Sequence, residues 1–147
     1  MPQPGQQPVY YRAFQFLIEI DGVTNARFQE VGGIDATVDV IEYREGGNAL
    51  GPRLFPGQTK HSRLSLKRGY TDDSTLYTWF EDVMTGRTEN IRRNISIVQI
   101  DMNGAEVFRW NLYKAFPVKY TAPAFNAKGN DISIETLEVA YERIERH

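Results

Sequence analysis

The strongest constraint on the fold is one amphipathic helix in a chain whose other apolar residues follow the period of β-strands. The helix is expected at about residues 74–85. Apolar side chains recur there at helical spacing and form one stripe: Leu76, Tyr77, Phe80, Val83 and Met84. Asp72, Asp73 or Ser74 can cap its start, and Gly86 suits the left-handed position after its end. A lone helix of about three turns cannot form a bundle, so we expect it to pack on a sheet.

Strand-like alternation surrounds this helix. Residues 14–20 place four apolar side chains on one face: Phe14, Phe16, Ile18 and Ile20. Residues 34–43 and 132–141 change phase partway, so apolar side chains lie on both of their faces. The first change indicates a bulge near Val40-Ile41, or a strand that leaves one sheet for another. Helix formers make Ile134–Arg146 possible as a helix, but its β-branched start and its alternation favour a strand.

Asn103-Gly104 predicts a two-residue type I′ hairpin turn, and this turn sets the register of its two strands. One side is the predicted core side, with the pairs Ile95–Leu112, Ile97–Trp110 and Gln99–Phe108. The other side is mixed in polarity, and it consists of Ser96, Val98, Ile100, Val107, Arg109 and Asn111. Asp101 is expected opposite Glu106, a like-charge pair that belongs at an exposed tip.

Residues 44–60 form the longest segment without strand periodicity, and we interpret them as a loop rich in glycine and proline. Leu50, Leu54 and Phe55 are apolar within it, so the loop is expected to dock on another subunit or to fold over its own domain. No Gly-x-x-x-x-Gly-Lys-Ser/Thr run is present to bind phosphate. The proline- and glutamine-rich residues 1–10 are expected to form a flexible arm, or one that orders against a neighbouring subunit.

Composition excludes several classes of function. A chain of 147 residues is expected to form a single domain, here residues 1–147. The net charge of −2 gives no basic field for nucleic acid, and the absence of cysteine removes disulfides and thiolate metal sites. His61 and His147 are the only imidazoles, and no serine or carboxylate lies in a catalytic pattern. Lys67-Arg68 and Arg92-Arg93 are interpreted as solvated strand ends. We therefore expect no enzyme, cofactor or metal, in a soluble cytoplasmic chain without a signal peptide or membrane span.

Several motifs in order resemble the tail tube family, the inner tube proteins of contractile phage tails and of phage-tail-like contractile injection systems. The resemblance covers about residues 12–143. It is carried by Leu54-Phe55-Pro56-Gly57-Gln58-Thr59-Lys60, Leu66-Lys67-Arg68-Gly69, Leu76-Tyr77-Thr78-Trp79-Phe80, Arg92-Arg93-Asn94, Trp110-Asn111-Leu112-Tyr113-Lys114-Ala115-Phe116-Pro117 and Ile134-Glu135-Thr136-Leu137-Glu138.

The resemblance implies a mainly β (α+β) fold: an antiparallel β-sandwich or small barrel with one helix packed on it. Hexameric rings would stack into a hollow tube, with strands of all six subunits joined in a ring-wide β-barrel. Residues 44–60 would make the contacts between rings, through Gly46, Gly47, Asn48, Leu50, Arg53, Leu54 and Phe55. The mixed side of the hairpin would line the lumen or face a partner, and the helix would lie toward the sheath.

The resemblance also implies partners and a place of action. A sheath would surround the tube, baseplate or hub and terminator proteins would cover its ends, and protein effectors or DNA would fill the lumen. Assembly would take place in the bacterial cytoplasm, within a virion or a released or membrane-anchored particle, without insertion of this chain into a membrane. Two alternatives stay open: a secreted effector carrier like the type VI haemolysin-coregulated proteins, and a monomeric ligand-binding β-barrel.

Overall fold

The computed structural model describes residues 15–21, 23–44, 46–47, 51–70, 73–86, 91–125, 127, 129 and 133–147. The expected N-terminal arm, Phe14 and Ile132 lie outside these residues. The elements in chain order are β1 (Gln15–Ile20), β2 (Val23–Phe28), β3 (Glu30–Gly32), β4 (Thr37–Tyr43), β5 (Arg53–Lys60), β6 (Leu64–Gly69), α1 (Thr75–Met84), β7 (Arg93–Ile100), β8 (Glu106–Thr121), β9 (Ile134–Ala140) and β10 (Arg143–Arg146). The chain is mainly β with one described helix, as the periodicity predicts.

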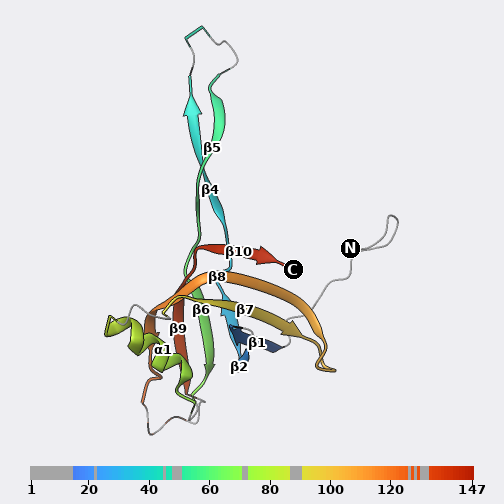
Figure 1. The fold of residues 1–147 in the computed structure, drawn as a ribbon, viewed down its shortest axis with the longest axis vertical. Coiled ribbons are helices and arrows are strands. Elements are labelled where there is room, and N and C mark those ends of the chain that lie inside the picture. Colours follow the sequence, from blue (N-terminus) through green and yellow to red (C-terminus); the bar gives the residue numbers. More distant parts are fainter. Residues whose placement is uncertain are drawn as a thin grey trace.

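Eight of the described strands form one antiparallel sheet in the order β2-β1-β7-β8-β9-β6-β3, with β10 paired to β8 (Figure 1). Only Gln29 separates β2 from β3, and its N–H donates to the Lys67 carbonyl of β6 at 2.9 Å. The long strand β8 bends at Lys114, whose φ is 53°. Its first half pairs with β7 and β10, and its second half pairs with β9. The sheet therefore curls. Its two end strands, β2 and β3, follow each other in the chain and lie at the two ends of the strand order.

The apolar core lies inside this curl, where side chains from β1, β6, β7, β8 and β9 meet the helix. Its fully buried members include Ile18, Leu64, Leu66, Trp79, Ile95, Leu112, Leu137 and Val139. The core side predicted for the β7–β8 hairpin is confirmed, because Ile95 pairs with Leu112 and Ile97 with Trp110.

The helix spans the predicted residues, but one part of its predicted apolar stripe is wrong. Leu76 and Trp79 are buried, whereas Tyr77 and Met84 are 42% and 56% exposed. Leu76 and Trp79 stand three residues apart and lie on the same face, so this face meets the core. Gly86 adopts the expected left-handed conformation, with φ 74°.

The β7–β8 turn is not the predicted type I′ turn. Only Gly104 of the central pair has a positive φ, 82°, and the Gly104 N–H donates to the Asp101 carbonyl. The Asp101 carboxylate accepts from the N–H groups of Asn103 and Ala105 at 2.9 Å. This side chain closes a longer, bulged loop, so Glu106 pairs with Ile100 and does not face Asp101.

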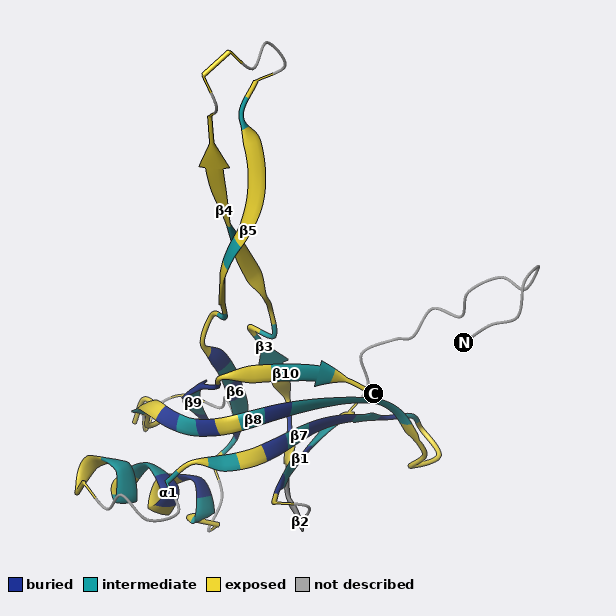
Figure 2. Ribbon diagram, turned by 45° about the horizontal axis from the view of Figure 1, so that its top comes forward, coloured by how far each residue is buried: buried dark blue, intermediate teal, exposed yellow. Residues whose placement is uncertain are grey.

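Residues 53–60 are not part of a loop, which corrects the prediction for residues 44–60. They form β5, which pairs with β4 in a hairpin that projects from the curled sheet (Figures 1 and 2). Pro56 does not prevent this pairing, because proline is tolerated on a strand with a free edge. The predicted bulge is present two residues early, between Val38 and Val40. The predicted strand character of the C-terminus is confirmed by β9 and β10.

Candidate functional site

Most of the described length of the projecting β4–β5 hairpin is exposed (Figure 2), and the hairpin carries large apolar side chains. Six of them are between 43% and 63% exposed: Val38, Val40, Ile41, Tyr43, Leu54 and Phe55. Within the described residues, β4 and β5 pair only with each other. A two-stranded hairpin is marginally stable by itself in water. This hairpin therefore carries apolar surface that its own domain does not cover.

Both faces of the hairpin are apolar. Ile41 pairs with Phe55 on one face, and Tyr43 pairs with Arg53 beside them. The Arg53 guanidinium lies 5.7 Å from the centre of the Phe55 ring. Leu54 points to the opposite face, because neighbouring strand residues alternate. One flat partner cannot cover both faces, so the hairpin fits a recess or the gap between two partner surfaces.

The sequence-predicted contact residues fall in three places. Gly46 and Gly47 are exposed at the turn of the hairpin, and Gly47 has a φ of 89°. Arg53, Leu54 and Phe55 lie together in β5. Asn48 and Leu50 lie outside the described residues. Sequence reasoning missed the matching residues of β4, although their apolar character on both faces was a visible signal.

The second predicted surface is the face of β7 and β8 that points away from the core. Ser96 pairs with Asn111, and the Ser96 hydroxyl donates to the Asn111 side-chain oxygen at 2.7 Å. Val98 pairs with Arg109 on the same face. The predicted contact of Ile100 with Val107 is wrong, because the bulge pairs Ile100 with Glu106. The remaining cross-strand pairs of this face are as predicted.

Arg109 spans this face from one side to the other. Its guanidinium is 2.6 Å from the Glu19 carboxylate on β1 and 2.8 Å from Glu106. Strand β7 separates β8 from β1, so the Arg109 and Glu19 side chains must meet above β7. Val98 of β7 pairs with both Arg109 and Leu17 and is 3% exposed. The hydrogen bond from Arg109 also lowers the pKa of Glu106. The face is therefore charged but internally paired.

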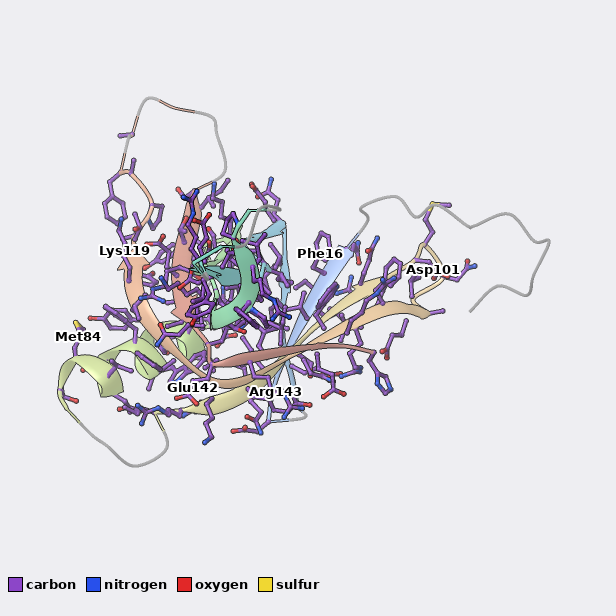
Figure 3. The ribbon with its side chains drawn as sticks, turned by 90° about the horizontal axis from the view of Figure 1, so that it is seen from above. Phe16, Met84, Asp101, Lys119, Glu142 and Arg143 are labelled. Atoms are coloured by element: carbon purple, nitrogen blue, oxygen red, sulfur yellow. The ribbon has the colours of Figure 1, made fainter. Side chains whose placement is uncertain are left out.

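The strands β2-β1-β7-β8-β10 end in β2 on one side and in β10 on the other, and within the described residues each of these two strands has a free edge. β2 pairs with β1 only, and β10 pairs with β8 only. On β10, the Arg143 guanidinium lies 4.5 Å from the centre of the Tyr113 ring and 2.9 Å from the Glu145 carboxylate. In Figure 3, which looks down the hairpin, the β7–β8 loop at Asp101 and the end of the helix at Met84 lie at opposite ends of the molecule. Free edges offer backbone hydrogen bonds to a strand of another chain.

Two features are absent from the described residues: a group of metal-ligating side chains and an apolar helix of membrane length. No group of three or more His, Asp or Glu side chains among them could hold a metal ion. In the same part of the chain, we find no helix with the length and apolarity that a membrane crossing requires. The His61 Nδ1 lies 2.7 Å from the Asp35 carbonyl oxygen, and the His147 N–H donates to the Arg109 carbonyl at 2.9 Å.

Comparisons with known proteins find chains of similar sequence and fold in contractile injection systems. The chain shares 26% identity with a chain of the sheath–tube complex of an extracellular contractile injection system, PVC, over 98% of its own length and 93% of the other, with a TM-score of 0.77. It also shares 26% identity with a chain of the anti-feeding prophage (AFP) baseplate, over 97% of both chains, with a TM-score of 0.75.

More distant structures share the fold alone. Hcp1 from Flavobacterium johnsoniae is 18% identical over 90% of this chain and 94% of that one, with a TM-score of 0.54. A search of curated proteins gave no match. Residues 12–145 match the family described as T4-like virus tail tube protein gp19. This chain therefore belongs to the tail tube protein family.

Proposed function

We propose that this chain builds the inner tube of a contractile injection system as a structural subunit without catalytic activity. Six copies form a ring, and rings stack along an axis into a hollow conduit. A contracting sheath drives this conduit into the target envelope, with baseplate and terminator proteins at its ends. The PVC sheath–tube complex and the AFP baseplate, each with a chain 26% identical to this one, support the sheath and the baseplate as partners.

The observation that carries the proposal is the hairpin with two uncovered apolar faces. Full burial of such a side chain stabilises by about 1.5–3 kcal/mol, so covering six half-exposed ones contributes roughly 4–9 kcal/mol per hairpin. Association costs the subunit translational and rotational freedom, and the free energy of that loss is of the same order as the gain from burial. A neighbouring ring presents the same contact six times, so stacked rings hold each other cooperatively.

The other two surfaces take complementary roles in the proposed tube. The free edges of β2 and β10 join neighbouring subunits of a ring into one continuous sheet. The face of Ser96, Val98, Arg109 and Asn111 then lines the lumen, where the single Arg109 guanidinium pairs with the carboxylates of Glu19 and Glu106 and one negative charge is left in excess. Protein effectors or DNA pass along this lining.

The test compares two variants that place one charge on equally exposed apolar positions. Leu54→Glu changes the hairpin, and Met84→Glu changes the helix; the two side chains are 62% and 56% exposed. Both variants are expected to keep the wild-type circular dichroism and melting temperature. Leu54→Glu is expected to raise the concentration needed for tube formation at least tenfold, measured by sedimentation and negative-stain microscopy.

Normal tubes from Leu54→Glu would contradict the proposed contact between rings. A wild-type chain that stays monomeric at the highest attainable concentration would contradict the tube itself. Closed rings that never stack would favour the alternative of a secreted ring carrying effectors.

A further inference from the structure

The direction in which the hairpin projects is set at its root, where two short segments join it to the sheet. Residues 33–36 lead into β4, and residues 61–63 lead out of β5. The two segments approach closely at Gly33, where an added Cβ would lie 2.2 Å from the Arg63 carbonyl oxygen. Gly33 also has a φ of 89°, so glycine is required here on both counts.

One side chain of the sheet reaches both segments. Tyr141 follows β9 directly, and it is 6% exposed. Its hydroxyl donates to the Gly33 carbonyl at 3.0 Å and accepts from the Asp35 N–H at 3.3 Å. Its ring lies against the His61 ring, with centroids 4.9 Å apart. Tyr141 thus contacts the chain where it enters the hairpin and where it leaves.

Asp35 ties the same two segments to each other. Its carbonyl binds the His61 Nδ1 at 2.7 Å, and its carboxylate accepts from the Ser62 N–H at 2.7 Å. This bond from Ser62 lowers the pKa of Asp35, so the carboxylate stays charged. Burial raises the pKa of Tyr141, so its hydroxyl stays protonated and able to donate. The root is therefore one connected cluster of hydrogen bonds between Tyr141 and the hairpin.

We propose that Tyr141 is a positioning residue that sets the angle of the β4–β5 hairpin relative to the sheet. Its consequence for assembly rests on the proposed function. β4 has seven residues and is therefore about 20 Å long. A 10° rotation at the root moves the far end by about 3.5 Å, which is most of the range of a side-chain contact. A hairpin free to rotate would seldom meet its recess in the next ring.

The test removes the hydroxyl and keeps the ring, with Tyr141→Phe. The matched control is Tyr120→Phe, which loses a hydrogen bond of 2.7 Å to Glu135 within the sheet and leaves the root untouched. The chain contains no cysteine, so spin labels on Leu54→Cys and Thr78→Cys report the distance between hairpin and helix alone. Pulsed electron paramagnetic resonance on the isolated full chain then measures the spread of this distance.

We expect a narrow distance distribution in the otherwise unchanged chain and with Tyr120→Phe, and one at least twice as wide with Tyr141→Phe. A distribution of equal width with Tyr141→Phe would overturn the anchoring role. This measurement needs no tube, so it tests whether Tyr141 holds the hairpin in place even if the proposed tube function is wrong.

The same two variants without labels test the consequence for assembly. Tyr141→Phe is expected to lower the yield of tubes at least fivefold relative to Tyr120→Phe at equal thermal stability. A broadened distance with a normal yield of tubes would overturn the role in assembly.

Discussion

Glu135→Gln is the sharpest test of how the helix is joined to the sheet. Arg68 of β6 and Glu135 of β9 are directly opposed, and both are 4% exposed. The Arg68 Nε donates to one Glu135 oxygen, and the Tyr120 hydroxyl donates to the other. Arg68 also donates to the Asp73 carbonyl at 2.8 Å, just before the helix. The pair corrects the interpretation of Lys67-Arg68 as a solvated strand end.

The expected loss follows from what the substitution leaves behind. Glutamine keeps the shape and can still accept from Arg68, while Tyr120 can accept a hydrogen bond in place of donating one. The main loss is the charge opposite a buried guanidinium, and breaking such a pair costs about 3–5 kcal/mol. Asp73 lies 3.4 Å from the same guanidinium and compensates in part, so we expect about 3 kcal/mol.

The measurement is urea unfolding of the monomeric chain, followed by circular dichroism, with the melting temperature as a second readout. A loss of about 3 kcal/mol lowers the melting temperature by roughly 6–12 °C in a chain of this size. Tyr120→Phe serves as the control, because it removes one hydrogen bond to the same carboxylate and is expected to cost about 1.5 kcal/mol. A loss below about 1 kcal/mol for Glu135→Gln, the value of an exposed ion pair, would refute the reasoning.

Two further predictions concern backbone geometry and pH. Gly33 and Gly47 share a φ of 89°, but only at Gly33 would a Cβ approach another residue within 4 Å, the Arg63 carbonyl. Gly47→Ala should therefore cost about 1–2 kcal/mol and Gly33→Ala clearly more, in urea unfolding; equal losses would contradict the close approach. Hydrogen bonds from Thr75 and the charge of Arg68 lower the pKa of Asp73 below its ordinary 3.8. This group therefore adds stability above about pH 4 that is lost on acidification, and Asp73→Asn should flatten the pH profile between pH 5 and 3.

Much of the local structure is encoded by residue periodicity. Alternation predicts β1, β4, β9 and the strands of the β7–β8 hairpin, because a strand with one buried face repeats every two residues. The capping residues and Gly86 predict the helix to within one residue at each end. The core pairs Ile95–Leu112 and Ile97–Trp110 follow from one turn, although the turn has another type. The turn type depended on the Asp101 side chain, which competes for the same backbone groups.

The candidate site was predictable in part. Leu54 and Phe55 were recognisable as apolar residues that need a covering surface, on another subunit or on their own domain, and Ser96, Val98, Arg109 and Asn111 as one face of a hairpin. The strand β5 was not, because Pro56 and Gly57 carry the signature of a loop and only pairing with β4 reveals the strand. The pairing of β4 with β5 depends on tertiary structure and follows from no local pattern.

The sequence by itself determined the helix and the strands β1, β4, β7, β8 and β9, because those choices depend on residues a few positions apart. Tertiary structure alone decided which distant charges meet, such as Arg109 with Glu19 and Arg68 with Glu135. The reason is that the local periodicity of a sequence does not determine the order of strands in a sheet. It also decided that the hairpin leaves the sheet and that Tyr141 holds its root. These contacts join segments far apart in the chain, and only the curl of the sheet brings them together.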